Sequence, residues 1–427
     1  MKFEELVDIN PITVLRRNAE YPFIEMSDIS IGGRYVISSN LRQYTGGGAK
    51  FCGGDVLFAR ITPCLENGKI AQFKTAEQMA FGSTEFIVLR GREGISDQGY
   101  IFYLALSDFI RKPAEKSMSG ASGRQRADLN VIKKIVVPEI TLPNQRKIAA
   151  ILSSYDDLTE NNLERIKILE EMAQNLYHEW FVNFHFPGHE KIKFVDSQLG
   201  MIPERWVVKN LGELLSFVIG GGWGEASQNH DELIPGFVIR GTDIPEARYS
   251  NVDKCPLRFH KPSNIFSRKI EPLDIVFEVS GGSKDQPLGR ALLVGPNVLK
   301  AFDNNVICAS FCKLIRTNQK MILPELLYLH FQDIYSNRQI LKYQVQSTGI
   351  SNFKFTYFQE RELILVPPSE IQDKFKNIVR PIFNAIQTIG LANTNLRKTR
   401  DLLLPKLISS EIDVSDLDSK VRDHHEP

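Results

Sequence analysis

Two stretches of the chain have the alternating three- and four-residue spacing of apolar positions that is typical of long helices packed along one seam. The first runs from about Asn144 to Trp180, and the second repeats its register after a shift of 227 residues. The seam positions are Ile148, Leu152, Tyr155, Thr159, Asn162, Ile166, Leu169, Ala173, Leu176 and Trp180 in the first, and Phe375, Val379, Ile382, Ile386, Ile389, Asn393, Leu396, Arg400, Leu403 and Leu407 in the second. Two matched rods, each preceded by a domain-sized block, predict an internally duplicated protein.

The blocks in front of the rods consist of short apolar runs broken by Gly, Pro and Asn, which predicts mixed α and β domains with many loops. Residues 99–109 have helical spacing. The predicted strands are Phe23-Ile24, Asp55–Phe58, Lys69–Phe73, Phe86–Leu89 and Ile135–Val137 in the first block, and Phe237–Arg240, Asp274–Val279, Arg290–Val294, Val306–Ile315 and Leu363–Val366 in the second. The predicted fold class is therefore α+β.

The two halves also match outside the rods, at short anchors between which they diverge freely. The matching anchors are Glu5-Leu6 with Glu213-Leu214, Asp55–Phe58 with Asp274–Phe277, Ile87–Arg90 with Lys313–Arg316, and the stretch 118–138 with 347–367. A shared scaffold with divergent inserts is expected when two copies of one domain recognise two different things.

Helix signals set the predicted boundaries. Thr141 is a plausible N-cap with Pro143 in the first turn, Ser369 and Gln372 have the spacing of a capping box, and Pro381 is expected to kink the second rod. The first rod would be roughly 55–60 Å long. The predicted segments are a first block over 1–143, a first rod over 144–186, a connector and second block over 187–368, a second rod over 369–412, and a polar, disordered tail over 413–427.

Composition changes this picture little. The 52 Lys and Arg against 51 Asp and Glu give a net charge of +1, so any nucleic-acid surface must be local. The five cysteines form no CxxC pair and indicate reduced thiols. We find no stretch of 18 apolar residues and no export signal, and we expect a soluble cytoplasmic protein.

At this point the residues resemble the specificity (S) subunits of type I restriction–modification systems. The stretches that carry the resemblance are GDVLFAR (54–60), STEFIVLR (83–90), VVPEITLPNQRKIAAIL (136–152), LYHEWFVNF (176–184), IPERW (202–206) and LLLPKLISSEI (402–412). Together they extend over nearly the whole chain. The chain departs from the pattern at Leu273 and Val279, where the first half has Gly54 and Arg60, and in the tail beyond Ile412.

The resemblance implies two pseudo-symmetric target-recognition domains, each reading one half of a split double-stranded DNA target. It implies that the long helices pack antiparallel as a coiled-coil spacer and dock methyltransferase (M) subunits, and that restriction (R) subunits join the complex. The chain itself would be non-catalytic. It would direct adenine-N6 methylation and ATP-dependent cleavage by partners that hold S-adenosylmethionine, ATP and Mg.

Residues able to contact DNA are basic side chains for phosphates, and Arg, Asn, Gln, Ser and Thr for bases. Each of these could equally be a solvated loop residue. The candidates are Arg60, Lys69, Arg124, Gln125 and Arg126 in the first block, and Lys284, Gln286, Arg290, Gln346, Ser347, Thr348, Asn352 and Lys354 in the second. The 124–126 stretch is the favoured group because it is basic, amide-bearing and follows glycines.

Two features of the rods have two interpretations each. Asn162 and Asn393 occupy seam positions, where a buried polar pair fixes register, or they face solvent at a loosely packed point. The aromatic cluster at the end of the first rod forms a partner-docking surface or seals the rod against its own domain. Its residues are Tyr177, Trp180, Phe181 and Phe184.

We find no P-loop, amino-methyltransferase motif, completed dinucleotide fingerprint, GxSxG or HExxH in the sequence. His185 and His189 straddle Pro187-Gly188, which disfavours a metal site there. Two alternatives remain open beside the S-subunit prediction. One is a self-contained DNA methyltransferase or nuclease with a coiled-coil spacer, and the other is an adaptor whose two blocks bind proteins.

Overall fold

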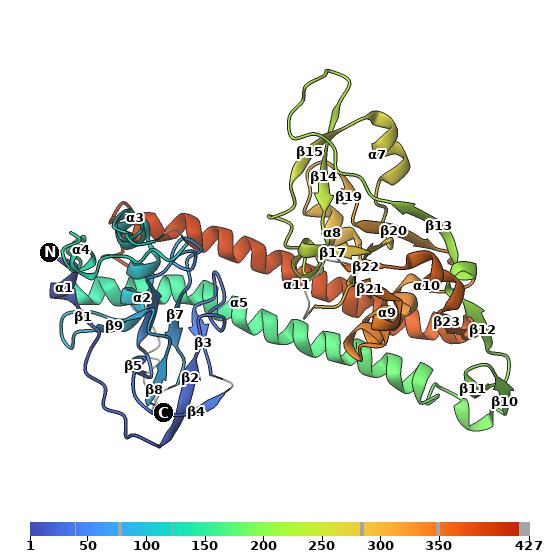
Figure 1. Ribbon diagram of the computed structural model, residues 1–427, viewed down its shortest axis with the longest axis horizontal. Coiled ribbons are helices and arrows are strands. Elements are labelled where there is room, and N and C mark those ends of the chain that lie inside the picture. The colour runs from blue at the N-terminus through green and yellow to red at the C-terminus, as the bar shows by residue number, and fades with distance from the viewer. Residues whose placement is uncertain (39, 76–78, 122, 282–285, 347–350, 418–427) are drawn as a thin grey trace. The chain divides into compact units, whose positions relative to one another are not determined.

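The computed structural model describes residues 1–38, 40–75, 79–121, 123–281, 286–346 and 351–417, which form two compact units. The first unit comprises Met1–Glu160 and the chain from Leu396 onward, and the second comprises Asn161–Asn395. Each unit therefore contains one block and a portion of both rods (Figure 1).

The rods are two long helices, α5 over Leu142–Tyr177 and α11 over Ser369–Ile408. α5 starts where Thr141 and Pro143 predict, and the Thr141 carbonyl accepts the N–H of Gln145 at 2.9 Å. It continues as a π-helical turn over His178–Val182, so the first rod ends before residue 186. α11 is helical through Pro381 and Pro405 without interruption.

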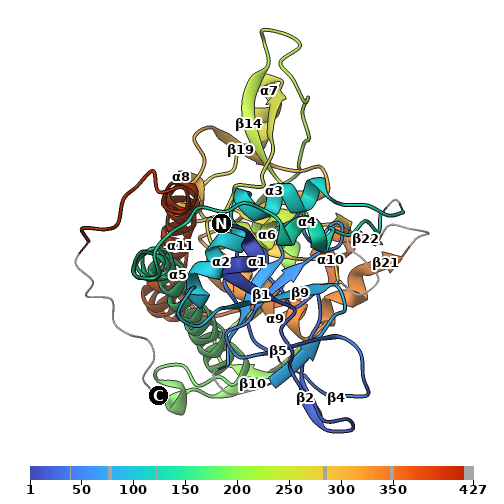
Figure 2. The same cartoon turned by 90° about the vertical axis from the view of Figure 1, so that its left-hand side faces the viewer.

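The two helices pack antiparallel within each unit. In the first unit, Ile148 and Leu152 from the start of α5 share a core with Leu404 and Leu407 from the end of α11. Figure 2 shows the ribbons of α5 and α11 side by side. In the second unit the pairing is reversed along the chain, because the end of α5 meets the start of α11 around Trp180 and Phe375. Every predicted seam position is buried or half-buried, as the spacing requires.

Polar groups interrupt the seam in both units. In the second, the Asn162 amide donates to Asn393 Oδ1 at 2.8 Å, and the two side chains are 5% and 2% exposed. The buried interpretation of this pair is therefore confirmed. In the first, a buried ion pair joins Arg400 to Asp156, which also accepts a hydrogen bond from Tyr103.

The first unit holds a five-stranded sheet in the order β1-β9-β6-β7-β3 and a four-stranded sheet in the order β4-β2-β8-β5. The strands are β1 Val7–Ile9, β2 Glu20–Ile24, β3 Tyr35–Val36, β4 Leu41–Gln43, β5 Ala49–Cys52, β6 Val56–Ala59, β7 Ile70–Phe73, β8 Met79–Gly82 and β9 Phe86–Gly91. The short helices are α1 Phe3–Leu6, α2 Gln98–Leu106, α3 Asp108–Lys116 and α4 Leu129–Lys133. The apolar helix α2 packs in one core with β6, β9 and the start of α5.

The second unit repeats this plan with a β13-β20-β16-β18 sheet and a β15-β14-β19 sheet. Smaller pairings are β10-β11, β12-β23 and β17-β22-β21. The strands are β10 Phe194–Ser197, β11 Gly200–Pro203, β12 Val207–Asn210, β13 Leu215–Gly220, β14 Ile234–Ile239, β15 Leu257–His260, β16 Ile275–Glu278, β17 Ser280–Gly281, β18 Ala291–Leu293, β19 Asn305–Cys308, β20 Cys312–Thr317, β21 Gln344–Gln346, β22 Ser351–Phe353 and β23 Leu363–Val366. The helices are α6 Ile244–Ala247, α7 Pro262–Arg268, α8 Pro296–Lys300, α9 Pro324–Ser336 and α10 Phe355–Arg361, with 3₁₀ turns over His189–Lys191, Leu211–Leu214, Gly241–Asp243 and Gln339–Tyr343.

Strand pairing shows that the units are copies of one α+β fold. The central strand β9 lies antiparallel between β1 and β6, as β20 does between β13 and β16. The second sheets each contain one parallel pair, β2 with β8 and β14 with β19. The predicted fold class and duplication are confirmed, and the anchors Asp55–Phe58 with Asp274–Phe277 and Ile87–Arg90 with Lys313–Arg316 lie on the equivalent strands β6 with β16 and β9 with β20.

Several local predictions were wrong. Residues 135–137 form no strand, only an isolated bridge between Val136 and Lys2, and 306–315 is two strands rather than one. Residues 413–417 of the tail are ordered, because Val414 is buried in the first unit and Lys147 donates to its carbonyl at 3.3 Å. The remaining tail residues, 418–427, lie outside the described part of the chain.

Candidate nucleic-acid interface

A buried carboxylate anchors the main sheet of each unit at the same place. Asp55 is 1% exposed and receives two hydrogen bonds from Arg90, both 2.7 Å long. Asp274 is equally buried and receives the same two bonds from Arg316, at 2.7 and 2.8 Å. In both arginines, these hydrogen bonds raise the guanidinium pKa above its ordinary value. Asp55 and Arg90 therefore hold the start of β6 to β9, as Asp274 and Arg316 hold β16 to β20.

A buried glutamine fixes the start of each long helix to its block. Gln145 in α5 and Gln372 in α11 each use the amide nitrogen for two backbone carbonyls and the amide oxygen for one backbone N–H. The partners are Ile95, Ile140 and Asp97 for Gln145, and Met321, Pro367 and Leu323 for Gln372. The capping box predicted from Ser369 and Gln372 is therefore wrong, because the Gln372 amide reaches across to the loop before α9. The carboxylate–arginine contact and the glutamine contacts are thus common to both units, and we call them the scaffold.

The surfaces above this scaffold differ, beginning with Arg126 in the first unit. Arg126 pairs as a β-bridge with Ile61 and with Ser119, and its side chain is 47% exposed. Its Nε and Nη2 both donate to the Glu85 carboxylate, at 2.6–3.0 Å. Arg60 donates to the same carboxylate from its Nε at 3.3 Å. The hydrogen bond from Arg126 is the main cause of the lowered pKa of Glu85. The Glu85 carboxylate thus contacts two guanidinium groups.

The other candidates of the first unit have separate roles. The Lys69 ammonium donates to the Met26 carbonyl at 2.6 Å and is half-buried. The backbone of Gln125 exchanges hydrogen bonds with Thr62, which places this residue beside the cis Thr62-Pro63 turn. Arg124 is exposed. The group 124–126 therefore lies together at the surface, whereas Lys69 is tied to another loop.

In the second unit, Asn352 takes the place of Arg126. Asn352 pairs with Ser280 and Val345 in the small β17-β22-β21 sheet, and Ser280 Oγ donates to Asn352 Oδ1 at 3.1 Å. The residue equivalent to Glu85 is Phe311, whose carbonyl accepts the N–H of Val279, as the Glu85 carbonyl accepts that of Arg60. The Phe311 ring is 60% exposed.

The remaining candidates of the second unit divide between surface and interior. Lys354 and Gln286 are exposed. Arg290 is instead buried against Glu278, to which its Nε donates at 2.9 Å, so its guanidinium is not presented to a ligand. Gln346 is the last residue of β21, and Lys284, Ser347 and Thr348 lie outside the described residues.

The aromatic cluster at the end of α5 is part of the core of the second unit. Trp180 and Phe181 are each 7% exposed, and their ring centroids lie 5.7 and 4.7 Å from that of Phe375 in α11. Phe184 packs edge-on against Trp206 at 5.6 Å. Tyr177 is also buried. The cluster therefore packs the helix end against its own unit, and its use as a partner-docking surface stays a prediction.

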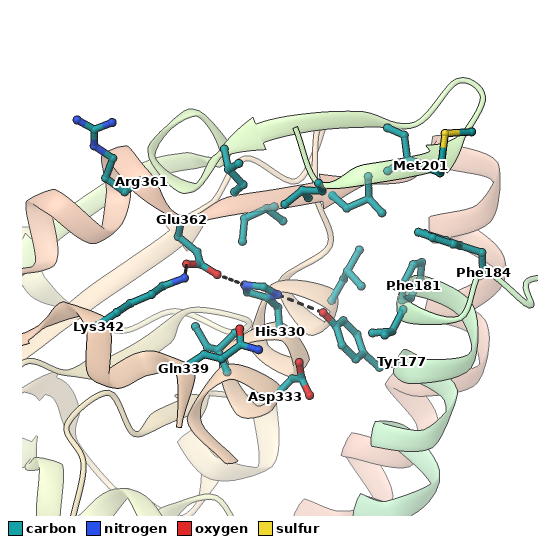
Figure 3. Close-up of a pocket in the computed structure, with 18 residues that line it drawn as sticks. Tyr177, Phe181, Phe184, Met201, His330, Asp333, Gln339, Lys342, Arg361 and Glu362 are labelled. Atoms are coloured by element: carbon teal, nitrogen blue, oxygen red, sulfur yellow. Dashed lines mark hydrogen bonds and ion pairs between the residues drawn. The ribbon is translucent and has the colours of Figure 1, made fainter. Parts of the chain in front are cut away.

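A cleft of about 450 Å³ lies beside this cluster in the second unit (Figure 3). Glu362 receives hydrogen bonds from His330 at 2.9 Å and from Lys342 at 3.0 Å, and His330 also contacts the Tyr177 hydroxyl at 3.1 Å. Burial would raise the pKa of Glu362, but its hydrogen bond with His330 and the other donors outweigh burial and lower it to about 2. The carboxylate is saturated by these internal partners.

Sequence reasoning missed Glu85, Ser280 and Phe311, the residues that surround the two candidate readers. Glu85 stands in STEFIVLR, where it reads as one charged residue before a strand. The strand pairing alone brings it to Arg126, 41 residues away. Among the described residues no cluster of His, Cys, Asp or Glu could hold a metal ion. Nor does the described part of the chain contain a helix with the length and apolar character needed to cross a membrane.

Comparison with known proteins gives one consistent result. Residues 5–171 match a family described as "Type I restriction modification DNA specificity domain". The type I restriction enzyme MjaIX specificity subunit of Methanocaldococcus jannaschii is 26% identical over 94% of this chain and 85% of its own length. The HindI specificity subunit of Haemophilus influenzae is 23% identical over 84% of this chain and 86% of its own length. The crystal structure of a type I S subunit from M. genitalium covers 96% of this chain and 95% of its own, with 16% identity and a TM-score of 0.53, and so shares the fold.

Two copies of one α+β unit, each built around a paired segment of the same antiparallel helices, define a class of duplicated proteins with two similar domains. The kept scaffold and the divergent surface residues of the two copies are what such a class requires. Residues 5–171 therefore match the type I DNA specificity domain, and the chain is similar over most of its length to specificity subunits of type I restriction enzymes.

Proposed function

We propose that each unit reads one half of a bipartite double-stranded DNA target and that the chain carries no reaction of its own. The observation that supports this most strongly is the contrast between the copies. The carboxylate–arginine and glutamine contacts of the scaffold are repeated, whereas Arg126 and Glu85 are replaced by Asn352 and Phe311 at equivalent places. Two equal frames with unlike surfaces are suited to two unlike base sequences.

The catalysis belongs to partner subunits in this proposal. Methyltransferase subunits with S-adenosylmethionine methylate adenine N6, and restriction subunits with ATP and Mg cleave DNA. The complex would act in the cytoplasm. Since the aromatic cluster of α5 is buried, the docking surface for the methyltransferase subunit is better sought on the exposed face of the helices. Ile168 and Met172, which are 54% and 51% exposed on α5 within the second unit, are the strongest candidates.

The docking proposal is tested by replacing Ile168 and Met172 together with Asp. We expect the variant chain to fold but to lose co-purification with its methyltransferase subunit, because two charges would enter an apolar contact. Phe266→Asp, at an exposed position on the short helix α7, is the control. Retained co-purification of the double variant would exclude this face of α5.

Half-site reading is tested by exchanging residues 1–140 for the first block of another family member and mapping methylated sequences in cells. One half of the recognised motif should change, and the other half should stay. A change in both halves would contradict the assignment of one unit to one half-site.

Two assays separate the proposed function from its two alternatives, a self-contained methyltransferase and a protein-binding adaptor. Methyl transfer from labelled S-adenosylmethionine to DNA by the pure chain alone would favour a self-contained methyltransferase. Sequence-blind or absent DNA retention in a gel shift with the methyltransferase subunit present would favour a protein-binding adaptor.

A further inference from the structure

Arg126 presents an unusual surface geometry in the first unit. Its Nε and Nη2 are both occupied by the two oxygens of Glu85, at 2.6–3.0 Å. This side-on contact uses one edge of the guanidinium and leaves the edge formed by Nη1 and the second Nη2 hydrogen facing outward, since the group has five donors in a fixed plane. The side chain is 47% exposed, so that edge is within reach of a ligand.

The fixed edge matches one partner among the DNA bases. Two parallel N–H donors about as far apart as the Nη atoms fit the O6 and N7 acceptors of guanine in the major groove, which is the commonest specific contact between arginine and DNA. Glu85 removes much of the rotational freedom of Arg126 before binding, and a donor fixed in its bound orientation loses less entropy on contact. Arg60, whose Nε reaches the same carboxylate at 3.3 Å, adds a second positive group beside the reader.

Stability does not explain the arrangement. The Arg126 side chain is 47% exposed, and solvent around it weakens the contribution of this ion pair to folding, although the Glu85 side chain is only 17% exposed. The hydrogen bonds between the Thr62 and Gln125 backbones and the bridges of Arg126 already hold this surface turn together. The contact between Glu85 and Arg126 therefore serves to orient the guanidinium.

The second unit supports this interpretation by its difference. At the place of Arg126 it has Asn352, whose Oδ1 is fixed by Ser280 at 3.1 Å, and at the place of Glu85 it has the exposed ring of Phe311. An amide pairs with adenine and an exposed ring with the thymine methyl group, rather than with guanine. Both copies thus hold a polar side chain at the same site, Arg126 or Asn352, and in each a neighbouring side chain holds it by hydrogen bonds. The two polar side chains are suited to different base pairs.

We propose that Arg126 is a specificity-determining residue that reads a guanine in the half-site of the first unit, with Glu85 as its positioning residue. This inference rests on the proposed function, because it assumes that the first unit reads DNA. It assigns a base and an atom-level contact that half-site reading alone does not.

The test is Arg126→Lys in the complete complex with its methyltransferase subunit, read out by mapping methylated sequences in cells. Lysine keeps the charge but replaces the planar pair of donors with a single rotatable ammonium, which restricts the choice of base less strictly. One G·C pair in the first half-site should become degenerate, with discrimination falling about tenfold or more, while the second half-site stays unchanged. Arg92→Lys, at another part-exposed arginine whose Nε donates to the Asp8 carboxylate at 2.8 Å, is the matched control and should leave the motif intact.

Glu85→Gln tests the positioning role separately. The amide can accept only one of the two guanidinium contacts, so the same G·C pair should become less strictly required although Arg126 is still present. Glu85→Asp, which keeps the charge, should restore the discrimination in part. Equal thermal unfolding of the variants and the parent chain shows that the effect is not a loss of fold.

An unchanged motif in the folded Arg126→Lys complex would overturn the inference. If that variant methylates no site, selection of bound DNA from a pool randomised in the first half-site replaces the cellular readout, and enrichment of the original guanine would overturn it equally. Exchange of residues 1–140 separates this inference from the proposed function. If the exchange changes one half-site but Arg126→Lys leaves the motif unchanged, the role of Arg126 is wrong and the proposed function stands. If neither change alters the motif, both are wrong.

Discussion

At the scale of single residues, the molecule separates side chains that build the unit from side chains that face a ligand. The Asp55–Arg90 contact and its copy Asp274–Arg316 have the same atoms, distances and burial in two sequences that otherwise diverge. Leu273 even keeps the left-handed backbone of Gly54, with φ of 73° against 89°, although leucine rarely adopts it. The constraint at these positions is therefore the geometry of the strand start, and it is common to both copies.

Loss of the anchoring carboxylate should destabilise either unit. Asp55→Asn removes the charge that two Arg90 bonds and the Cys52 N–H surround, and breaking a buried pair in this way costs about 3–5 kcal/mol. Asp274→Asn should cost a similar amount. Urea unfolding measures both, and Asp108→Asn, in the exposed pair with Lys112, should shift the free energy of unfolding by less than about 1 kcal/mol. Equal effects at Asp55 and Asp108 would show that the buried pair is not an anchor.

His260 should make the second unit sensitive to acid. It is 1% exposed, and burial together with the neighbouring Arg258 lowers the pKa of His260 below its ordinary 6.5, although its hydrogen bond to the Gly236 carbonyl opposes this. Below pH 6.5 the imidazole of the unfolded chain is protonated while that of the folded chain is still neutral. The free energy of unfolding therefore falls as the pH drops below 6.5, by about 1.4 kcal/mol per unit of difference between the two pKa values. His260→Gln, which keeps a donor but cannot protonate, should flatten the dependence of the thermal midpoint on pH. An identical slope in the variant would mean that other groups cause it.

The sequence predicted the candidate site only in part, and the reason lies at this scale. Basic and amide residues in a glycine-bearing loop identify Arg126 and Asn352 as candidates from composition alone. Whether an arginine faces outward depends on contacts distant in sequence: Arg290 has the same chemistry as Arg126 but is buried against Glu278. Nothing local to either residue distinguishes them, because the partner carboxylate lies 41 residues before Arg126 and 12 residues before Arg290.

At the scale of elements, periodicity predicted the long helices well and the small elements poorly. A seam repeated over many turns is a redundant signal, so single polar positions such as Asn162 do not hide it. The 13-residue helix α9 was missed because it is apolar on most of its surface, with Leu326, Leu327 and Phe331 all buried, and a buried helix has no polar stripe. Residues 135–137 have strand composition but pair only through one bridge, since the opposing strand is the short start of the chain.

The asparagine pair in the seam should be coupled. Asn162→Leu leaves Asn393 Oδ1 without its Asn162 donor inside an apolar seam, and should cost about 1–3 kcal/mol of unfolding free energy. Replacing both by Leu removes the mismatch and should be close to neutral, so a double-mutant cycle by urea unfolding should give a coupling of about 0.5–3 kcal/mol. Asn161→Leu, the same change on the exposed neighbour, is the control. Additive single and double effects would show that the two amides do not act as a pair.

At the scale of the whole molecule, two continuous helices connect the two units. α5 has 36 residues and α11 has 40, and each begins in one unit and ends in the other. A flexible linker would let the readers accept half-sites at many separations. Paired helices with a fixed register accept few, so the gap between half-sites should be set by the number of residues in the two helices.

Insertion of seven residues into both helices, after Glu160 and after Asn395, tests this relation. Seven residues preserve the seam and add about 10 Å, which is about three base pairs of DNA. The favoured gap should lengthen by that amount, as mapped by methylated motifs in cells.

Three base pairs also turn the second half-site by roughly 100° around the duplex, given about 10.5 pairs per turn. The variant with one insertion in each helix should therefore methylate DNA weakly. Three such insertions add about 31 Å, close to one full turn, and should recover more methylation than one. Insertion into α5 alone breaks the pairing with α11 and should abolish methylation at every gap. An unchanged gap in the paired insertions would mean that the helices do not set the spacing.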